Sequence, residues 1–452
     1  MATFDKKAPG VYVEEISKLP PSVASVATAI PGFVGYTERG TKNTAIRVES
    51  LIDFEEKFGY ACKIAISDEE NKINGLEYKL HESMRLFYAN GGGICYVVSV
   101  GNYTDAISNT ALETGISMLE PIDEVTMIVV PDAVSLEIED LASVQNAALA
   151  QCLELKDRVA ILDVKDTGNC NTDATNFRNS IGTKGASYGA AYYPYIKSVY
   201  DREINVYDIY KGLGLSGNEL EDAQKYAVLS EPTEESTLFA KQLMSKPEYA
   251  KLVAKIQEQA NLLPPSGAIA GIYCANDNQR GVWHAPANMS VSGISDINVR
   301  ISDKQQGELN ENTSGKCINA IRAFQGKGIL VWGARTLDGL SSEWKYISVR
   351  RFFNYVEESI QESTAWAVFQ PNDANTWVKV RCQIENFLSN LWRDGALAGS
   401  TPQEAFYVRV GINQTMTAQD ILNGYMIVEI GMAAVRPAEF IVLQFSHKLQ
   451  ES

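Results

Sequence analysis

Three continuous apolar runs in the first half of the chain alternate with stretches of helical spacing. The runs Ile94–Val100, Val125–Val130 and Arg158–Val164 are typical of strands buried on both faces of a sheet. Leu76–Ala89 and Ile138–Leu155 carry apolar residues three and four positions apart, which predicts amphipathic helices. Strands and helices that alternate with short loops predict a mostly parallel sheet covered by helices. We therefore expect a multi-domain chain that is α/β in its first part and α+β overall.

The pattern changes between residues 201 and 262, where the sequence becomes polar and acidic. Ser236–Ser245 and Glu248–Asn261 still have helical spacing, and a Pro-Pro-Ser-Gly run ends the stretch. We interpret it as a helical insertion on the outer surface of the α/β domain. Ile269–Ala275, a short apolar run directly after it, is predicted to be another strand.

The last third of the chain predicts a smaller arrangement of helices and strands. Val349–Gln361 and Thr376–Asp394 are amphipathic, and Asn375 or Thr376 is expected to cap the second helix. Four short segments are predicted to be strands: Ile329–Trp332, Trp344–Ser348, Tyr425–Ile430 and Glu439–Phe445.

The N-terminus predicts an isolated strand. Val11–Ile16 alternates between apolar and polar residues, and the Pro-containing segment Ser17–Ala29 follows it as an extended linker. Such a strand has no partner nearby in the sequence. It is either an edge strand of its own domain or an arm that adds to the sheet of a neighbouring chain, and the pattern does not decide between them.

Composition restricts the class of function. The chain has 452 residues, 45% hydrophobic and 21% charged, and a net charge of −16, which describes a globular protein of two or three domains. The negative charge argues against nucleic acid as a partner, and no apolar run is long enough to cross a membrane. No secretory signal is expected, and the seven scattered cysteines indicate reduced thiols in the cytoplasm. With three histidines and no CxxC spacing, we expect neither a metal nor a cofactor.

Two glycine-rich motifs resemble catalytic signatures without the context that those signatures need. Gly185–Gly189 matches GxSxG, but a polar loop precedes it and strand-like sequence follows, the reverse of a nucleophile elbow. Gly212–Gly217 matches GxGxxG, but no buried strand precedes it. We therefore expect no catalytic residues, and an enzyme is the least favoured class of function.

Several separate segments, in the same order along the chain, resemble contractile tail sheath proteins of myophages and of phage-tail-like extracellular injection particles. They are PGFVGYTERG within Ile30–Gly40, PPSGAIAG…RGVWHAPAN over Pro264–Asn288, the block Lys327–Glu362, and PAEFI near the C-terminus. Cys317–Ile321 resembles a further segment of the family. There Lys316-Cys317 replaces the usual glycine, so this loop departs from the family pattern.

The resemblance implies a structural subunit that polymerises as stacked hexameric rings around an inner tube and contracts to drive that tube through a target envelope. It implies as partners other copies of the chain, the inner tube protein, and baseplate and terminal cap proteins. Assembly would be cytoplasmic, and the product a virion or a released injection particle. Strands exchanged between subunits would comprise Val11, Tyr12, Val13, Glu14, Glu15, Ile16, Phe440, Ile441, Val442 and Leu443.

The resemblance also implies three regions: an arm and linker over 1–29, a protruding α/β domain over 30–325, and a C-terminal sheath domain over 326–452. One face of the helix at Thr376–Asp394 is polar and basic. It is either a solvated surface or a contact with the inner tube, and the tube-contact hypothesis names Lys379, Gln383, Asn386 and Arg393. A non-contractile, capsid-like assembly protein remains the alternative function.

Overall fold

The computed structural model describes residues 23–67, 72–229, 231–311 and 313–440. Among these, residues 26–357 and 436–440 form a larger unit, and residues 23–25 and 358–435 form a smaller one. The helix α12, Ile347–Thr364, runs across the boundary between the two. Residues 326–357, which the sequence groups with the C-terminal domain, belong to the larger unit. The division of the chain into the three regions 1–29, 30–325 and 326–452 stays a prediction.

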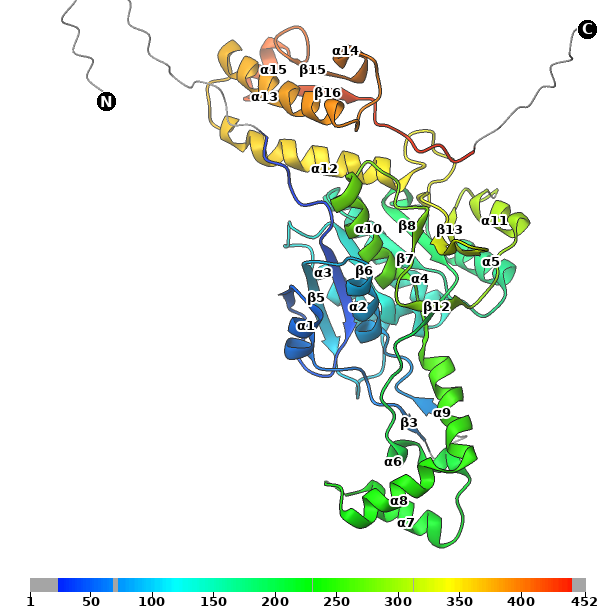
Figure 1. Cartoon of the computed structure of the whole chain (residues 1–452). Helices are drawn as coiled ribbons and strands as arrows, with labels where there is room; N and C mark the ends of the chain where they lie inside the picture. The colour runs from blue at the N-terminus through cyan, green and yellow to red at the C-terminus, as the bar shows by residue number, and fades with distance from the viewer. Residues whose placement is uncertain (1–22, 68–71, 230, 312, 441–452) are drawn as a thin grey trace, which may run out of the picture. The chain divides into compact units, whose positions relative to one another are not determined.

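The larger unit is built on a sheet of nine described strands in the order β11-β14-β13-β8-β7-β6-β1-β5-β2. Figure 1 labels five of these strands, β5, β6, β7, β8 and β13. Neighbouring strands from β13 to β5 run parallel, which confirms the predicted mostly parallel sheet. Antiparallel strands complete both ends. The strands are β1 Pro31–Tyr36, β2 Ala45–Val48, β5 Cys95–Gly101, β6 Met127–Val129, β7 Val159–Asp163, β8 Gly189–Tyr193, β11 Met289–Ser290, β13 Ile318–Phe324 and β14 Gly328–Val331.

Helices cover both faces of this sheet. One face packs against α3 Asn109–Ser117, α4 Ile138–Leu155 and α5 Cys170–Ser180, and the other against α1 Leu51–Phe58, α2 Leu80–Ala89 and α10 Ser266–Arg280. Successive strand residues enter opposite cores: Val98 lies in the first and Val97 in the second. This alternation explains why the strands read as continuous apolar runs, because both of their faces are buried.

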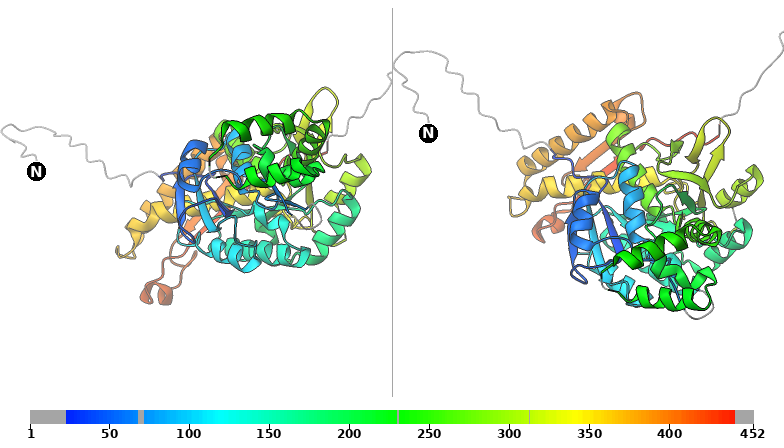
Figure 2. Two further views of the ribbon diagram at one scale, coloured as in Figure 1. Left: turned by 90° about the horizontal axis from the view of Figure 1, so that it is seen from below. Right: turned by 60° about the horizontal axis from the view of Figure 1, so that its bottom comes forward.

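The acidic stretch is helical, as its spacing predicts, and its interpretation as an insertion stays a prediction. It contains α6 Val206–Ile209, α7 Asn218–Ala227, α8 Glu234–Met244 and α9 Pro247–Ala260, which lie together in each view (Figures 1 and 2). Two small apolar clusters hold it. One of them includes Ile66, from the antiparallel pair β3 Ala65–Ile66 and β4 Ile73–Asn74, and Ile64 just before β3. A second small sheet joins β9 Ile196–Ser198 to β10 Leu262–Leu263 and β12 Ile294–Ile297.

The predicted strand Ile269–Ala275 is wrong, because these residues lie in the middle of the buried helix α10. A Cβ atom on Gly267 would lie 2.5 Å from the Ser83 carbonyl oxygen of α2, and one on Gly271 would lie 2.4 Å from that of Phe87. Small residues four positions apart let α2 and α10 approach closely. The apolar run therefore reflects a helix buried on all sides rather than a strand.

The smaller unit contains the end of α12, helix α13 Ala374–Arg393 and a two-stranded antiparallel sheet. The sheet pairs β15 Phe406–Val410 with β16 Val428–Met432, and the connection holds the short helix α15 Ala418–Leu422. Both long helices confirm the sequence prediction. The cap of α13 does not: Asp373, rather than Asn375 or Thr376, accepts a hydrogen bond from the Thr376 N–H at 3.0 Å.

Two predicted strands near this region also need correction. Trp344–Ser348 makes a single bridge, from Tyr346 to Arg335, and Tyr346 then accepts the first hydrogen bonds of α12. The strand predicted over Tyr425–Ile430 begins only at Val428, because the Tyr425 N–H still closes the end of α15 on Asp420. The predicted strand Val11–Ile16 lies outside the described residues, as does Glu439–Phe445 beyond Phe440.

Candidate assembly interface

The two-stranded sheet of the smaller unit has one packed face and one polar face. Val408 and Val410 are 8% and 6% exposed, whereas Tyr407 and Arg409, which alternate with them, point outward. On the polar face the Tyr407 hydroxyl donates to Glu429 at 2.8 Å, and the Arg409 guanidinium lies over the Tyr407 ring. The sheet thus has cross-strand contacts on its polar face and shows the alternation of a half-buried antiparallel pair.

Helix α13 supports this sheet from the packed side. Its inward positions are buried, and hydrogen bonds close both ends: the Asp373 carboxylate accepts from the Thr376 N–H at the start, and the Asp394 N–H donates to the Asn390 carbonyl at the end. These inward residues are Val380, Ile384, Phe387, Leu388 and Leu391. The helix therefore covers the packed face of the two strands.

The outer edges of this small sheet are open. In the part of the chain that the structure describes, β15 and β16 pair only with each other, so each has one edge without a strand partner. Two strands alone are marginally stable in water, and an open edge is a template for another strand. Such a sheet can accept one further strand on each side.

The predicted exchange residues fall almost wholly outside the described chain. Val11 to Ile16 and Ile441 to Leu443 are not described, and only Phe440 is, in a non-helical, non-strand conformation and 71% exposed. The predicted exchange of these residues therefore stays a hypothesis.

The predicted tube-contact face of α13 is only partly a surface. Lys379, Asn386 and Arg393 are exposed. Gln383 is 2% exposed, accepts from Trp366 Nε1 at 2.8 Å and donates to the Ser363 carbonyl at 3.0 Å. Gln383 therefore packs within the smaller unit, and the exposed basic surface comprises the other three residues.

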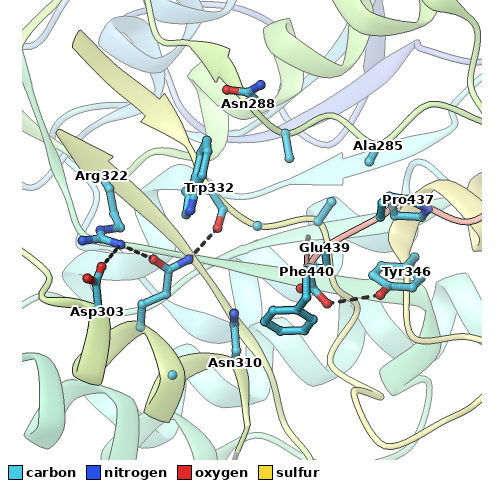
Figure 3. Close-up of a pocket in the computed structure, with 16 residues that line it drawn as sticks. Ala285, Asn288, Asp303, Asn310, Arg322, Trp332, Tyr346, Pro437, Glu439 and Phe440 are labelled. Carbon is cyan, nitrogen blue, oxygen red and sulfur yellow. Dashed lines mark hydrogen bonds and ion pairs between the residues drawn. The ribbon is translucent and has the colours of Figure 1, made fainter. Parts of the chain in front are cut away.

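The C-terminal segment is fixed to the rest of the larger unit by the ion pair of Glu439 with Arg335. Figure 3 draws the neighbouring hydrogen bond between Glu439 and Tyr346. Glu439 accepts two hydrogen bonds from the Arg335 guanidinium, at 2.7 Å each, and a third from the Tyr346 hydroxyl at 3.1 Å. Arg335 is 1% exposed and also donates to the Asn310 carbonyl at 2.9 Å. Burial lowers the pKa of Arg335, but the carboxylate of Glu439 outweighs burial, and the net shift is upward.

A cavity of about 420 Å³ lies beside this ion pair. The C-terminal segment Pro437–Phe440 forms one wall, and loops and strands around Trp332, Arg322 and Asn288 form the others (Figure 3). Gln306 bridges two of these walls, donating to the Trp332 carbonyl at 3.0 Å and accepting from Arg322 at 2.6 Å. The C-terminal segment is therefore packed on one side only.

The N-terminal linker meets the larger unit through a second buried arginine. Arg351, the fifth residue of α12, donates to the Thr28 carbonyl at 2.9 Å and pairs with both oxygens of Asp277 at 2.6 and 3.0 Å. Both partners of this ion pair are 3% exposed. The guanidinium also lies over the Tyr273 ring, 4.6 Å from its centre. Two charge-assisted contacts and a stacking contact make this a stable junction.

Sequence reasoning did not find these two arginines. The sequence indicates these arginines only by their position. Each lies in an apolar segment, VWGART or ISVRRFF, where a solvated arginine is not expected. The carboxylate partners, Glu439 and Asp277, lie far away in the sequence, so the pairing is visible only in the fold.

The two catalytic look-alikes lack the required context in the structure. Ser187 lies in a short 3-10 turn, Ala186–Tyr188, that leads into β8, so no helix follows it. Gly212–Gly217 follows helix α6 rather than a strand. Within the described chain, no helix is long and apolar enough to span a membrane, and no group of His, Cys, Asp and Glu has the arrangement of a metal site.

Comparison with known proteins identifies the architecture. The model of the phage tail sheath protein central domain matches residues 105–337, and that of the phage tail sheath C-terminal domain matches residues 341–448. The sheath of the PVC extracellular contractile injection system, in its contracted state, is 31% identical, with a TM-score of 0.69 and 99% of each chain covered. The contracted helical sheath of the anti-feeding prophage is 30% identical, with a TM-score of 0.66, covering 97% of this chain and 99% of that one.

A curated phage relative shares only part of its length with this chain. The tail sheath protein of Vibrio phage KVP40 is 23% identical over 192 residues, which are 42% of this chain and 27% of the relative. The chain thus spans about a quarter of that protein. The two sheath domains together cover most of the present sequence, and the chain belongs to the phage tail sheath family, a family of structural proteins of contractile tails.

Proposed function

We propose that this chain polymerises into a helical sheath of stacked hexameric rings around an inner tube, and that terminal strands exchanged between subunits hold the rings together. The observation that carries the proposal is the two-stranded sheet β15–β16, which is ordered by α13 yet has two open edges. Val11–Ile16 of one neighbour and Phe440–Leu443 of another supply a strand for each edge. The result is a four-stranded sheet built from three chains.

Exchanged strands suit a sheath that moves. Each backbone hydrogen bond contributes only about 1 kcal/mol net, but several bonds for each strand, repeated in every subunit, hold a continuous mesh. Contraction then rotates the larger units as rigid bodies and leaves the mesh intact. The energy comes from contacts formed between larger units, without nucleotide hydrolysis, and we propose no catalytic role for the chain.

The proposed partners follow the relatives. The PVC and anti-feeding prophage structures are a sheath complex, a helical sheath and a baseplate. We infer that copies of this chain, the inner tube, the baseplate and a terminal cap protein are its partners. Assembly takes place in the cytoplasm, and the finished sheath is part of a virion or of a released injection particle.

Proline substitution tests the exchange of strands. Tyr12→Pro with Glu14→Pro removes two backbone donors from the proposed N-terminal strand, because proline has no N–H. We expect folded protein, with an unchanged far-UV circular dichroism spectrum, that forms no tubes in negative-stain electron micrographs. The matched control, Lys6→Pro with Ala8→Pro, places two prolines outside the strand and should form tubes.

Deletion of Met1–Ser17 should have the same effect as the proline pair. Normal tubes from either the deletion or the Tyr12→Pro/Glu14→Pro variant would show that the N-terminal strand is not what joins the subunits.

A further inference from the structure

We propose that Arg335 and Arg351 are the anchors from which the two terminal arms of the chain transmit force to the large sheet. The inference rests on the proposed strand exchange, since an arm that carries no neighbour needs no anchor. It goes further by naming the residues that bear the pull on each arm.

The C-terminal arm has one strong attachment in the described chain. Pro437–Phe440 lies along the cavity, so little packing holds it, and Phe440 is already 71% exposed. Glu439 makes this attachment: each of its two carboxylate oxygens accepts a hydrogen bond of 2.7 Å from the planar guanidinium of Arg335. A pull on residues beyond Phe440 therefore passes through the side chain of Glu439 into Arg335.

Arg335 passes this pull into the sheet. Its backbone N–H donates to Asn319 Oδ1 at 2.8 Å, and the Asn319 amide donates back to the Arg335 carbonyl at 2.8 Å. Asn319 lies in β13, which pairs with β8 in the parallel part of the sheet. The anchor is thus joined to the large sheet of the larger unit.

Where it enters the large sheet, the N-terminal arm is held at three successive residues. Thr28 accepts from Arg351, Ala29 accepts from the Cys274 thiol at 3.4 Å, and the Ile30 N–H donates to Thr126 Oγ1 at 2.9 Å. The next residues are β1, inside the parallel sheet. Of these contacts, Arg351 alone makes a charge-assisted bond to the linker, so it defines where the linker ends and the fixed sheet begins.

Both anchors lie in one short segment, residues 335–351, and backbone hydrogen bonds join the two ends of this segment. The Thr336 N–H donates to the Lys345 carbonyl at 2.9 Å, and the Ile347 N–H donates to the Ala334 carbonyl at 3.0 Å. The same segment therefore receives the pull of both arms. The segment lies within the block Lys327–Glu362, which resembles sheath proteins. This block therefore joins the two arms inside one subunit.

Lysine substitutions test the anchors without changing the arms. Lysine keeps the charge but cannot make the two parallel bonds of a guanidinium. In unassembled Arg335→Lys, chymotrypsin should cut after Phe440 about ten times faster than in the parent chain, while elastase cleavage within residues 23–29 stays unchanged. Arg351→Lys should show the opposite pattern. The cleaved sequences are identical in all variants, so the rates report only how firmly each arm is held.

Arg300→Lys is the matched control, because Arg300 pairs with Asp296 on the surface and is 67% exposed. It should change neither cleavage rate. Sheaths assembled from Arg335→Lys or Arg351→Lys should release subunits in guanidinium chloride about ten times faster than sheaths of Arg300→Lys. Parental cleavage rates in both lysine variants would overturn the anchors. Faster cleavage with parental sheath durability would overturn their mechanical role.

A second pair of variants guards against a folding defect. Glu439→Gln weakens the same anchor from the terminal segment, outside either apolar core, and Glu311→Gln removes an exposed carboxylate 3.8 Å from the same arginine. Glu439→Gln sheaths should release subunits faster at an unchanged thermal midpoint, and Glu311→Gln sheaths should not. Equal release by the two variants would overturn the proposal. Tube formation after deletion of Met1–Ser17 would instead contradict the strand exchange itself.

Discussion

At the scale of single residues, the larger unit buries carboxyl groups that the sequence does not mark as special. Asp163, at the end of β7, is 4% exposed and accepts a hydrogen bond from the Ser266 N–H at 2.9 Å, at the start of α10. Burial raises the pKa of Asp163 to about 7, although the bonds from Ser266 oppose this shift. Asp132 is similar: burial raises its pKa to about 6 against three backbone donors.

The raised pKa of Asp163 predicts a loss of stability as the pH rises. In the unfolded chain an aspartate titrates near pH 4, so between about pH 4 and pH 7 the folded protein holds a proton that the unfolded chain has lost. The free energy of unfolding therefore falls as the pH rises through this window. Asp163→Asn keeps an oxygen acceptor without the charge and should lack this part of the decline.

The measurement is the midpoint of urea denaturation for the parent chain and for Asp163→Asn at pH 5 and pH 8. Relative to the parent, the variant should be more stable at pH 8 than at pH 5. A difference between the two proteins that is the same at both pH values would mean that Asp163 is ionised in the fold.

At the scale of elements, the sequence predicts best where the apolar pattern has one explanation. The helix expected over Ile138–Leu155 has those bounds in the structure, because its apolar stripe meets one face of the sheet. The strand prediction for Ile269–Ala275 was wrong because a helix buried on all sides has no polar stripe, so its sequence resembles that of a buried strand. The remaining signal was the spacing of small residues, Gly267, Gly271 and Ala275, which indicates close contact between helices.

That contact predicts opposite effects for two glycine-to-alanine changes. Gly271→Ala places a methyl group 2.4 Å from the Phe87 carbonyl oxygen, so α2 and α10 must separate, at a cost of about 1–3 kcal/mol. Gly307→Ala, in the exposed helix α11 Asp303–Asn310, meets no atom within 4 Å and should stabilise by about 0.5–1 kcal/mol. Denaturant unfolding of the two variants measures both. Similar stability changes would argue against a tight α2–α10 contact.

At the scale of the whole molecule, the sequence identified the family but not the joints within one subunit. The motifs that resemble sheath proteins are local, so they survive in a single sequence. The pairings Arg335–Glu439 and Arg351–Asp277 join residues 104 and 74 positions apart, and no local pattern links such partners. The open edges of the small sheet could not be predicted either, because they appear only once the ladder of β15 and β16 is known.

The charge of the whole molecule gives the last prediction. The chain carries a net charge of −16, yet the surface of α13 exposes Lys379 and Arg393, neither of which has an ion-pair partner in the described part of the chain. Cations left free on an acidic protein favour a contact with acidic groups of a partner, and we expect that partner to be the inner tube.

Lys379→Glu with Arg393→Glu should therefore reduce co-sedimentation of the tube with the extended sheath, as should raised salt. Lys251→Glu with Lys255→Glu makes the same charge change at exposed positions of α9 and should leave co-sedimentation unchanged. If both pairs reduce it equally, the effect is one of net charge, and α13 is not the tube-binding surface.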